Sequence, residues 1–360
     1  MTPRSDQLAR AAALRSVFEA RGAVVVETPV LQPAETLLDL YGEDIRARAY
    51  VTSDALRGEQ MLRPDFTVPV VQMHMSHGAE PARYTYSGEV FRRQEIDEDR
   101  ANEYLQVGYE IFDRTDPAAA DAEVFALIAQ QVSHLNLRAA TGDIGILMAA
   151  VTGLRTTAPR RAALMRHIWR PRRFRGLLDR YAGRAPTNEA RRALIEGRAP
   201  ECTSPLVGKR SRQEIEARVA ALHDDAAAPP ISELEVDLIE ALLAVRETLP
   251  YALEQLRDLA VDMPSIAEAV DRLGRRAEAL ERQGVNVTDL PFEASYGRAS
   301  MEYYDGFVFG FYSAQRADLP AVATGGRYDA LTRQLGRGAA IPAVGGVLRP
   351  GLILELEAQG

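Results

Sequence analysis

Two segments, 86–94 and 102–110, constrain the fold of this chain more than any other feature, and the second of them alternates between apolar and polar residues. This periodicity and the polar stretch between the segments predict the two strands of a β-hairpin. In the second strand one face is apolar, whereas the other carries Gln106 and Glu110 with Gly108 between them. This spacing leaves room for a small polar ligand. The same pattern also fits an ordinary half-exposed strand whose polar residues face solvent.

The composition bounds the class of protein. The chain has 360 residues, of which 46% are hydrophobic and 26% are charged, and this length predicts a globular protein with two domains. A net charge of −8 argues against a dedicated nucleic-acid binder. The first residues lack the apolar core of a signal peptide, and no apolar run reaches membrane-spanning length. We therefore expect a cytoplasmic protein with no membrane partner.

Cysteine and histidine usage argues against metal chemistry. The single cysteine, Cys202, cannot form an internal disulfide framework or a thiolate zinc site. The five histidines show no metal-ligand spacing beyond the pair His74 and His77. That pair lies among methionines and fits packing or surface exposure better than a ligand role. We therefore predict no metal site and no cofactor.

The residue pattern changes twice along the chain. Strand signals are frequent up to about residue 150, helix follows helix from 152 to about 283, and aromatic strand composition returns from 285. We therefore predict an α+β fold with a helical insertion. The predicted core domain consists of residues 1–151 and 285–360, and the predicted helical insertion domain consists of residues 152–284.

Four motifs occur in order along the chain. They are Leu62-Arg63-Pro64-Asp65-Phe66-Thr67, the hairpin, Met301-Glu302-Tyr303-Tyr304 and Gly325-Gly326-Arg327-Tyr328-Asp329. Together they resemble the motifs of class II aminoacyl-tRNA synthetases, and of histidyl-tRNA synthetase in particular, in which the hairpin is motif 2. The resemblance implies a class II synthetase-like core, which is an antiparallel sheet flanked by helices.

The resemblance also implies a histidine-binding pocket and assigns no catalytic residue to this chain. The implied pocket residues are Asp65, Thr67, Arg92, Gln106, Glu110, Tyr304 and Tyr328. A carboxylate such as Glu110 suits a ligand with an ammonium group and an imidazole N–H, because charge-assisted hydrogen bonds are strong. Asp65, where the family has glutamate, would hold the α-amino group together with Thr67, although its side chain is one methylene shorter. Tyr304 and Tyr328 would close the pocket with their rings and hydroxyls, and core packing is the alternative explanation for both tyrosines.

Positions that bind ATP in the synthetases carry other residues here. Ala299 stands where the family has an arginine, and Arg298, one place earlier, would point to the opposite face of a strand. Leu352 replaces the arginine of motif 3, and Gln94 replaces the glutamate that meets the adenine. The loop 95–100 carries four carboxylates, which would repel a triphosphate. We therefore expect no working synthetase.

A histidine pocket without adenylation machinery resembles the regulatory subunits of ATP phosphoribosyltransferase. The chain ends about ten residues after motif 3, so we expect no anticodon-binding domain. The resemblance implies a non-catalytic subunit that the short catalytic subunit requires for activity, and that mediates feedback inhibition by L-histidine in the first step of histidine biosynthesis. It further implies a homodimer, built by motif 1, within a hetero-oligomer such as a hetero-octamer. Histidine could bind in the synthetase-like pocket or at the interface with the catalytic subunit.

One basic cluster allows two interpretations. Seven arginines lie around Trp169, namely Arg160, Arg161, Arg166, Arg170, Arg172, Arg173 and Arg175. Clustered arginines beside an aromatic ring can contact phosphates and stack on bases, which would indicate RNA binding. A solvated helix face or a partner-protein surface explains the same pattern. Two alternative functions remain. The motifs leave an active histidyl-tRNA synthetase as one, and the arginine cluster leaves a synthetase-like RNA-binding protein as the other.

Overall fold

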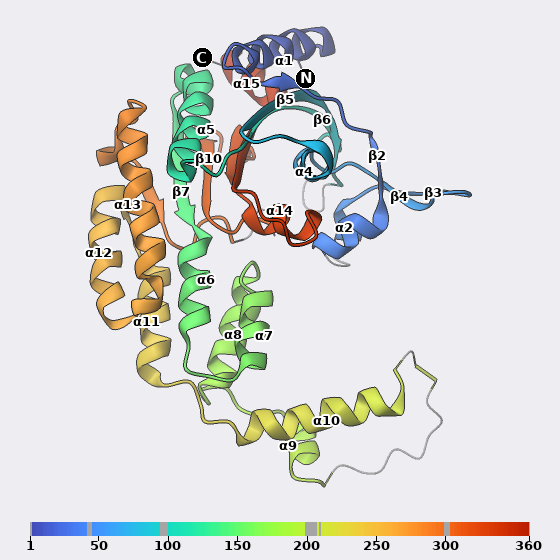
Figure 1. Ribbon diagram of the computed structural model, residues 1–360, viewed down its shortest axis with the longest axis vertical. Helices are drawn as coiled ribbons and strands as arrows, with labels where there is room; N and C mark the ends of the chain where they lie inside the picture. Colours follow the sequence, from blue (N-terminus) through green and yellow to red (C-terminus); the bar gives the residue numbers. More distant parts are fainter. Residues whose placement is uncertain are drawn as a thin grey trace.

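The computed structural model describes residues 2–41, 45–93, 100–198, 207–208, 210–298 and 303–359. Its main element is a nine-stranded sheet in the order β1-β5-β6-β12-β11-β10-β7-β9-β8 (Figure 1). The strands are β1 (Val24–Val25), β5 (Ala82–Phe91), β6 (Glu103–Phe112), β7 (Leu137–Asp143), β8 (Arg246–Thr248), β9 (Pro291–Glu293), β10 (Phe307–Ser313), β11 (Ala323–Arg327) and β12 (Ala343–Leu348). All pairs from β5 to β7 are antiparallel, whereas β1 joins β5 and β9 joins β7 in parallel. The predicted antiparallel core is therefore confirmed.

The predicted hairpin is formed by β5 and β6, the longest strands of the sheet. Its register places Tyr86 opposite Gly108 and Gly88 opposite Gln106. On the other side of β6, Gly345 of β12 lies opposite Glu110. Both neighbours of β6 thus carry glycine beside a large polar or aromatic side chain, which leaves space for those side chains.

Helices cover both faces of the sheet (Figure 1). The covering helices are α1 (Arg4–Glu19), α5 (Pro117–Val132) and α15 (Pro350–Glu357) on one face, and α4 (Thr67–His77) and α14 (Asp329–Leu335) on the other. Side chains along β6 alternate between the two faces of the sheet, and each face packs against its own helices. Tyr109 stacks on Phe18 of α1 with ring centroids 5.1 Å apart, whereas Phe112 stacks on His74 of α4 at 4.0 Å.

A second, three-stranded sheet lies beside the first. It consists of β2 (Leu31–Pro33), β4 (Gly58–Leu62) and β3 (Val51–Asp54), with the short helices α2 (Ala34–Tyr41) and α3 (Ile45–Arg48) next to it. Both strand pairs are antiparallel. Leu31 and Val51 nevertheless remain exposed, so this small sheet presents apolar side chains at the surface.

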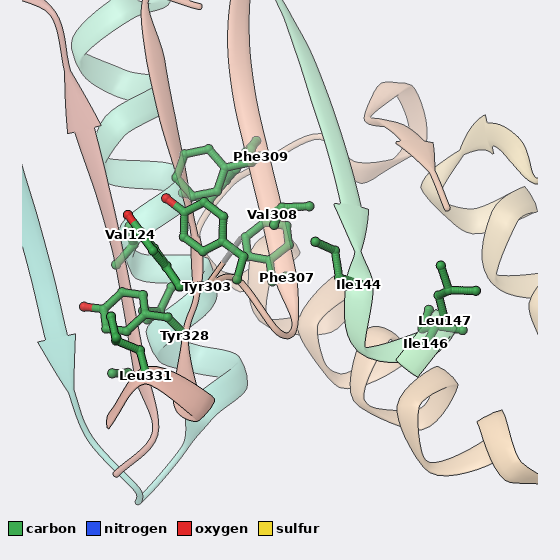
Figure 2. Packing of buried hydrophobic residues seen from close by; sticks show 14 of the residues in the cluster. Val124, Ile144, Ile146, Leu147, Tyr303, Phe307, Val308, Phe309, Tyr328 and Leu331 are labelled. Carbon is green, nitrogen blue, oxygen red and sulfur yellow. The ribbon is translucent and has the colours of Figure 1, made fainter. Parts of the chain in front are cut away.

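The core between α5 and the sheet is rich in phenylalanine. Phe125 of α5 contacts three phenylalanines that β10 points toward the same face, Phe307, Phe309 and Phe311. Figure 2 shows part of this cluster, with Tyr303 and Tyr328 beside it. Because β10 presents alternate residues to one face, three aromatic rings meet one helix.

A buried ion-pair network joins this core to helix α13 (Ala267–Arg282). Arg276 donates to Asp121 of α5 at 2.7 Å and to Asp143 at the end of β7 at 2.8 Å. Arg327 donates to Asp121 at 2.7 Å and to Asp329 at 3.0 Å. Two guanidinium groups and three carboxylates therefore compensate each other, as buried charges require. Of these groups, Asp329 is partly exposed and the others are buried.

The chain between β7 and β9 is mostly helical, as its pattern indicates. The helices are α6 (Ile144–Gly153), α7 (Ala158–Arg166), α8 (Pro171–Tyr181), α9 (Glu189–Ile195), α10 (Arg212–Ala227), α11 (Glu233–Ala244), α12 (Leu249–Asp262) and α13, with short 3-10 turns at Ser133–Leu135, Pro264–Ile266 and Val287–Asp289 beside or within this region. Strand β8 was not expected, since three residues are too few to show a period. It pairs with β9 and so adds a strand from the helical region to the edge of the nine-stranded sheet.

Helices α9 and α10 extend away from the rest of the molecule (Figure 1). Within Arg212–Ala227 no side chain is buried, and a capping box of Ser211 and Glu214 fixes the start of α10. The ends of this segment meet, because the N–H of Ile231 donates to the carbonyl of Tyr181 at 3.0 Å. Arg160 of α7 closes the same point, with hydrogen bonds to Asp225 at 2.6 Å and to the Pro229 carbonyl at 2.7 Å.

Candidate functional site

The carboxylate of Glu110 lies at the centre of the candidate site. Three hydroxyl groups of described residues donate to it, from Thr67 at 3.1 Å, Tyr86 at 2.8 Å and Tyr328 at 2.5 Å. Glu110 is 1% exposed, and burial raises its pKa to about 7 against the opposing effect of these hydrogen bonds. The side chain therefore changes charge near neutral pH, and a cationic ligand beside it would favour the charged form.

Tyr86 occupies the space that the sequence suggests for a ligand. A Cβ atom at Gly108 would lie 2.1 Å from the ring of Tyr86, and one at Gly345 would lie 1.4 Å from Oε2 of Glu110. The expected gap between Gln106 and Glu110 is thus filled by a cross-strand tyrosine, and the prediction of open space there was wrong. The glycine at 108 instead lets the Tyr86 hydroxyl reach Glu110.

Gln106 is buried on the same face of β6. It is 1% exposed, and its Oε1 has no hydrogen-bond partner among the residues that the structure describes. A buried acceptor without a partner is costly, so it indicates a donor that a ligand or water supplies. Since both Gln106 and Glu110 are buried, the alternative of a half-exposed strand with solvent-facing polar residues is wrong.

Asp65 and Arg92 approach the same site from the edge of α4 and the end of β5. Oδ1 of Asp65 accepts from the N–H of Val68 at 3.2 Å, so the carboxylate also supports the first turn of α4. Nε of Arg92 donates to the carbonyl of Pro64 at 2.7 Å. The two charges act in opposite directions on the pKa of Tyr304, which Asp65 raises and Arg92 lowers.

Tyr304 and Tyr328 form an aromatic wall with Tyr303 between them. Tyr303 packs edge-on against Tyr304 at 4.8 Å and against Tyr328 at 6.1 Å between ring centroids. Burial, together with the charge of Glu110, raises the pKa of both Tyr304 and Tyr328. Both hydroxyls therefore stay protonated, and that of Tyr328 serves as a donor to Glu110. Both tyrosines also belong to the buried hydrophobic core, so their packing fits the alternative as well.

A basic region lies toward the other end of the same face of β6. The guanidinium of Arg349 lies 5.7 Å from the ring centroid of Tyr104 and donates to the Ala321 carbonyl at 2.6 Å. Its Nε is buried without a partner in the described part of the chain. Burial lowers its pKa, and the charges of Arg92 and Arg100 lower it further. The face thus runs from an acidic end at Glu110 to a basic end, which suits a ligand that carries both charges.

Sequence reasoning did not assign Tyr86 or Arg349 to this site. The period of the hairpin places Tyr86 on the correct face, but only the register reveals its contact with Glu110. Arg349 directly precedes α15, and its neighbour Tyr104 is distant in sequence. Leu352, which replaces the arginine of motif 3, is partly buried and packs against the core.

Arg298 lies in a turn after β9 and not in a strand, so the premise of the strand-based prediction was wrong. Its Nε donates to the Ile168 carbonyl at 2.8 Å, and its guanidinium lies 4.9 Å from the ring centroid of Phe174. Burial lowers its pKa to about 10. The side chain therefore engages the α7–α8 segment. The other positions compared with the synthetases, Gln94, the loop residues 95–99, Ala299, Met301 and Glu302, lie outside the described residues.

Within the described ranges, no group of three or more histidine, cysteine, aspartate and glutamate side chains is arranged to hold a metal ion. In the same ranges no helix combines the length and the apolar character needed to cross a membrane.

The family model described as histidyl-tRNA synthetase matches residues 4–196 and 212–351. Curated ATP phosphoribosyltransferase regulatory subunits from Brucella ovis and Brucella abortus are each 33% identical to this chain over 355 residues, and the matches cover 92% of this chain and 93% and 92% of theirs.

Two solved structures share the fold. An ATP phosphoribosyltransferase regulatory subunit/histidyl-tRNA synthetase from Bacillus halodurans is 21% identical, with a TM-score of 0.69 over 99% of this chain and 80% of its own. Histidyl-tRNA synthetase from Nostoc sp. PCC 7120 is 18% identical, with a TM-score of 0.64 over all of this chain and 76% of its own. With the class II synthetase-like sheet and these relatives, the chain belongs to the family of ATP phosphoribosyltransferase regulatory subunits, a histidyl-tRNA synthetase-like group.

Proposed function

We propose that this chain is the histidine-responsive, non-catalytic subunit of a short-form ATP phosphoribosyltransferase. In this role it is required for the activity of the short catalytic subunit and mediates feedback inhibition by L-histidine in the first step of histidine biosynthesis. The observation that carries the proposal is the buried Glu110 carboxylate, to which three hydroxyl groups donate, on the same strand face as the Gln106 oxygen that has no partner among the described residues.

The chemistry of the site suits histidine. The Glu110 carboxylate can accept from the α-ammonium group or from an imidazole N–H, and the Gln106 oxygen can accept the other donor. The basic end at Arg92 and Arg349 suits the ligand carboxylate. Asp65, Thr67, Tyr304 and Tyr328 then complete the proposed histidine-binding set. We propose that this pocket, rather than the interface with the catalytic subunit, binds the effector.

Feedback inhibition requires that histidine binds one state of the complex better than another, because a ligand of equal affinity shifts no equilibrium. A coupling free energy of about 1–3 kcal/mol between histidine and the active state accounts for an inhibition of roughly 5- to 150-fold. The chain itself would perform neither adenylation nor aminoacylation. Leu352, which cannot bind a phosphate group, supports this part of the proposal.

We further propose a homodimer within a hetero-oligomer such as a hetero-octamer. Val24 and Val25 form the edge strand β1 and are 60% and 39% exposed, and Leu31 and Val51 of the small sheet are 49% and 42% exposed. An exposed edge strand with apolar side chains is a natural pairing surface. The division into a core of residues 1–151 and 285–360 and an insertion domain of residues 152–284, and a cytoplasmic location, also belong to the proposal.

The decisive experiment mixes the chain with a short-form catalytic subunit and measures phosphoribosyl transfer with and without histidine. We expect activity to depend on the chain and to fall when histidine is added. If neither activity nor histidine sensitivity changes, the proposed function is wrong. Histidine-dependent exchange between pyrophosphate and ATP would instead identify an active synthetase, and salt-sensitive tRNA binding would identify an RNA-binding protein.

Calorimetry with histidine locates the pocket. Glu110→Gln keeps the shape of the side chain but removes its charge, and it should weaken histidine binding about tenfold or more, since a charge-assisted hydrogen bond is lost. Glu247→Gln, a change of the same kind at an exposed position of β8, should leave the affinity unchanged. Equal affinities for both variants would place histidine elsewhere.

A further inference from the structure

Six of the seven arginines around Trp169 divide into two groups in the structure. Three of them have structural partners. Arg160 pairs with Asp225, Arg161 donates to the carbonyls of Leu154 and Thr156, and Arg175 pairs with Glu240. By contrast, Arg166, Arg172 and Arg173 are exposed and form no ion pair with any residue that the structure describes. These three surround the connection between α7 and α8, residues 166–173, which we call the basic turn.

The basic turn concentrates positive charge where the local fold gains nothing from it. Helix α8 begins with Pro171, Arg172 and Arg173, has no acidic residue in its first turn, and has no side-chain cap at Arg170. The N-terminus of a helix already carries positive partial charge, so cations there are unfavourable. Burial and the neighbouring arginines also lower the pKa of His167. Charge that works against its own helix indicates a role in contacts with another molecule.

Two hydrogen bonds connect the basic turn to residues at or near the wall of the proposed histidine pocket. Nε1 of Trp169 donates to the carbonyl of Tyr304 at 3.3 Å, and Nε of Arg298 donates to the carbonyl of Ile168 at 2.8 Å. The ring of Tyr304 packs against Tyr303 at 4.8 Å between centroids, and Tyr303 packs at 6.1 Å against Tyr328, the donor to Glu110, so Tyr304 belongs to the wall of the proposed pocket. The basic turn therefore contacts the wall of the proposed pocket directly, through the side chain of Trp169.

We propose that the basic turn is the docking surface for an acidic face of the catalytic subunit, and that the bond from Trp169 to Tyr304 couples docking to histidine binding. This inference rests on the proposed function, because it names the surface and the coupling contact of that complex. A few well-placed cations suffice to steer and orient an acidic protein surface. On docking, the basic turn would move relative to Tyr304. Histidine would bind better either to the free position or to the docked position of the turn, and this difference couples the two binding events.

An acidic protein fits the basic turn better than RNA does. Recognition of single-stranded RNA relies on exposed rings that stack on bases. Across α7 and α8, however, Phe174 and Tyr181 are buried, and Trp169 is partly buried with its N–H already bonded to Tyr304.

Charge reversal tests the docking surface. The variant Arg166→Glu with Arg172→Glu and Arg173→Glu is compared with Arg257→Glu, Arg275→Glu and Arg282→Glu, three exposed arginines of α12 and α13. Affinity for the catalytic subunit is measured by biolayer interferometry at two salt concentrations. We expect the first variant to bind at least tenfold more weakly, chiefly through slower association, and the control to stay within about threefold of the wild type.

Histidine binding to the isolated first variant, measured by calorimetry, should match the wild type and so show an intact fold. If the first variant binds the catalytic subunit as well as the control does, the basic turn is not the docking surface, while the proposed function stands. If the variant loses only binding of labelled tRNA, the basic turn contacts RNA and the inference is overturned. A wild-type chain that binds no catalytic subunit contradicts the proposed function itself.

The coupling contact has its own test. Trp169→Phe removes the N–H donor and keeps an aromatic ring in place. We measure the dissociation constant for the catalytic subunit with and without histidine. In Trp169→Phe, the ratio of these two constants should be at least threefold closer to one than in the wild type. In the control, Tyr251→Phe at an exposed ring of α12, the ratio should not change. An unchanged ratio in Trp169→Phe would show that the coupling runs by another route.

Discussion

Tyr328 donates its hydroxyl hydrogen to Glu110 across 218 positions of the sequence, with 2.5 Å between the two oxygens. The bond joins the segment before α14 to strand β6, and it is one of the influences that hold down the pKa of a carboxyl group that burial raises. The charge state of the candidate site therefore depends on contacts between distant parts of the chain.

Tyr328→Phe removes this donor. We expect the pKa of Glu110 to rise above about 7, so that more of the carboxyl is protonated at neutral pH and histidine binds roughly five- to tenfold more weakly. Calorimetry at pH 7 and pH 8.5 checks this, because the deficit should shrink as the higher pH restores the charge. A deficit that is equal at both pH values would show that the ring hydroxyl contacts the ligand directly.

Stability should depend on pH through Glu110. Its pKa is about 7 in the folded state against 4.5 as the ordinary value, so the folded chain holds the proton more tightly. The stabilisation is fully present below pH 4.5 and is lost as the pH rises to about 7. Relative to the wild type, Glu110→Gln should gain about 3 kcal/mol in the free energy of unfolding between pH 4 and pH 8. Urea denaturation at both pH values measures this, and a constant difference would contradict the buried, titrating carboxyl.

Gln106→Leu separates binding from stability. The buried Oε1 has no partner in the described structure, so its removal should leave the free energy of unfolding unchanged or raise it by about 1 kcal/mol. The stabilisation that added histidine provides should fall at the same time. Thermal denaturation with and without histidine measures both effects. A variant that loses stability and keeps its histidine affinity would assign Gln106 a structural role only.

Asp121→Asn should weaken the core strongly. The change leaves Arg276 and Arg327 with less negative charge in a buried network, and loss of one partner from such a network costs about 3–5 kcal/mol. The control, Glu268→Gln, breaks an exposed pair with Arg272 and should cost less than about 0.5 kcal/mol. Urea denaturation curves compare the two. Similar losses would mean that the network is not closed in solution.

Val24→Lys with Leu31→Lys places charge on the exposed apolar strands. We expect the proposed homodimer to dissociate at concentrations where the wild type is dimeric, because two charged side chains from each chain would be buried in the interface. Sedimentation velocity measures the change. Leu234→Lys, at an exposed leucine of α11, is the matched control, and dimers of equal stability in all three proteins would place the interface elsewhere.

The sequence contained enough to predict the fold class and the family, and both are confirmed. The hairpin was predictable because its second strand alternates with a period of two, and the order of the four motifs identified the synthetase-like core. The role of the seven proposed residues in histidine binding stays a prediction, although Thr67, Glu110 and Tyr328 are joined by hydrogen bonds.

Contacts that depend on register or on distant segments were not predictable. The period of β5 places Tyr86 on the pocket face, but its position over Gly108 follows from the exact pairing of the two strands. Arg298 was assigned to a strand because a local pattern cannot show that β9 ends at Glu293 and a turn follows. The burial of Arg349 arises from Tyr104 and Ala321, which are far from it in the chain.

The hydrogen bond between Ile231 and Tyr181 has a consequence for how this molecule can change. The segment 182–230 begins and ends at neighbouring positions of the helical region. Arg160, which lies outside the segment, forms hydrogen bonds to Asp225 and to the Pro229 carbonyl near its end. Such a segment behaves as an appendage that insertion, deletion or replacement can alter without opening the sheet, since the chain ends it must join stay adjacent. Descendants of this protein, and engineers, can therefore modify that arm while the hydrogen bonds around Glu110 stay intact.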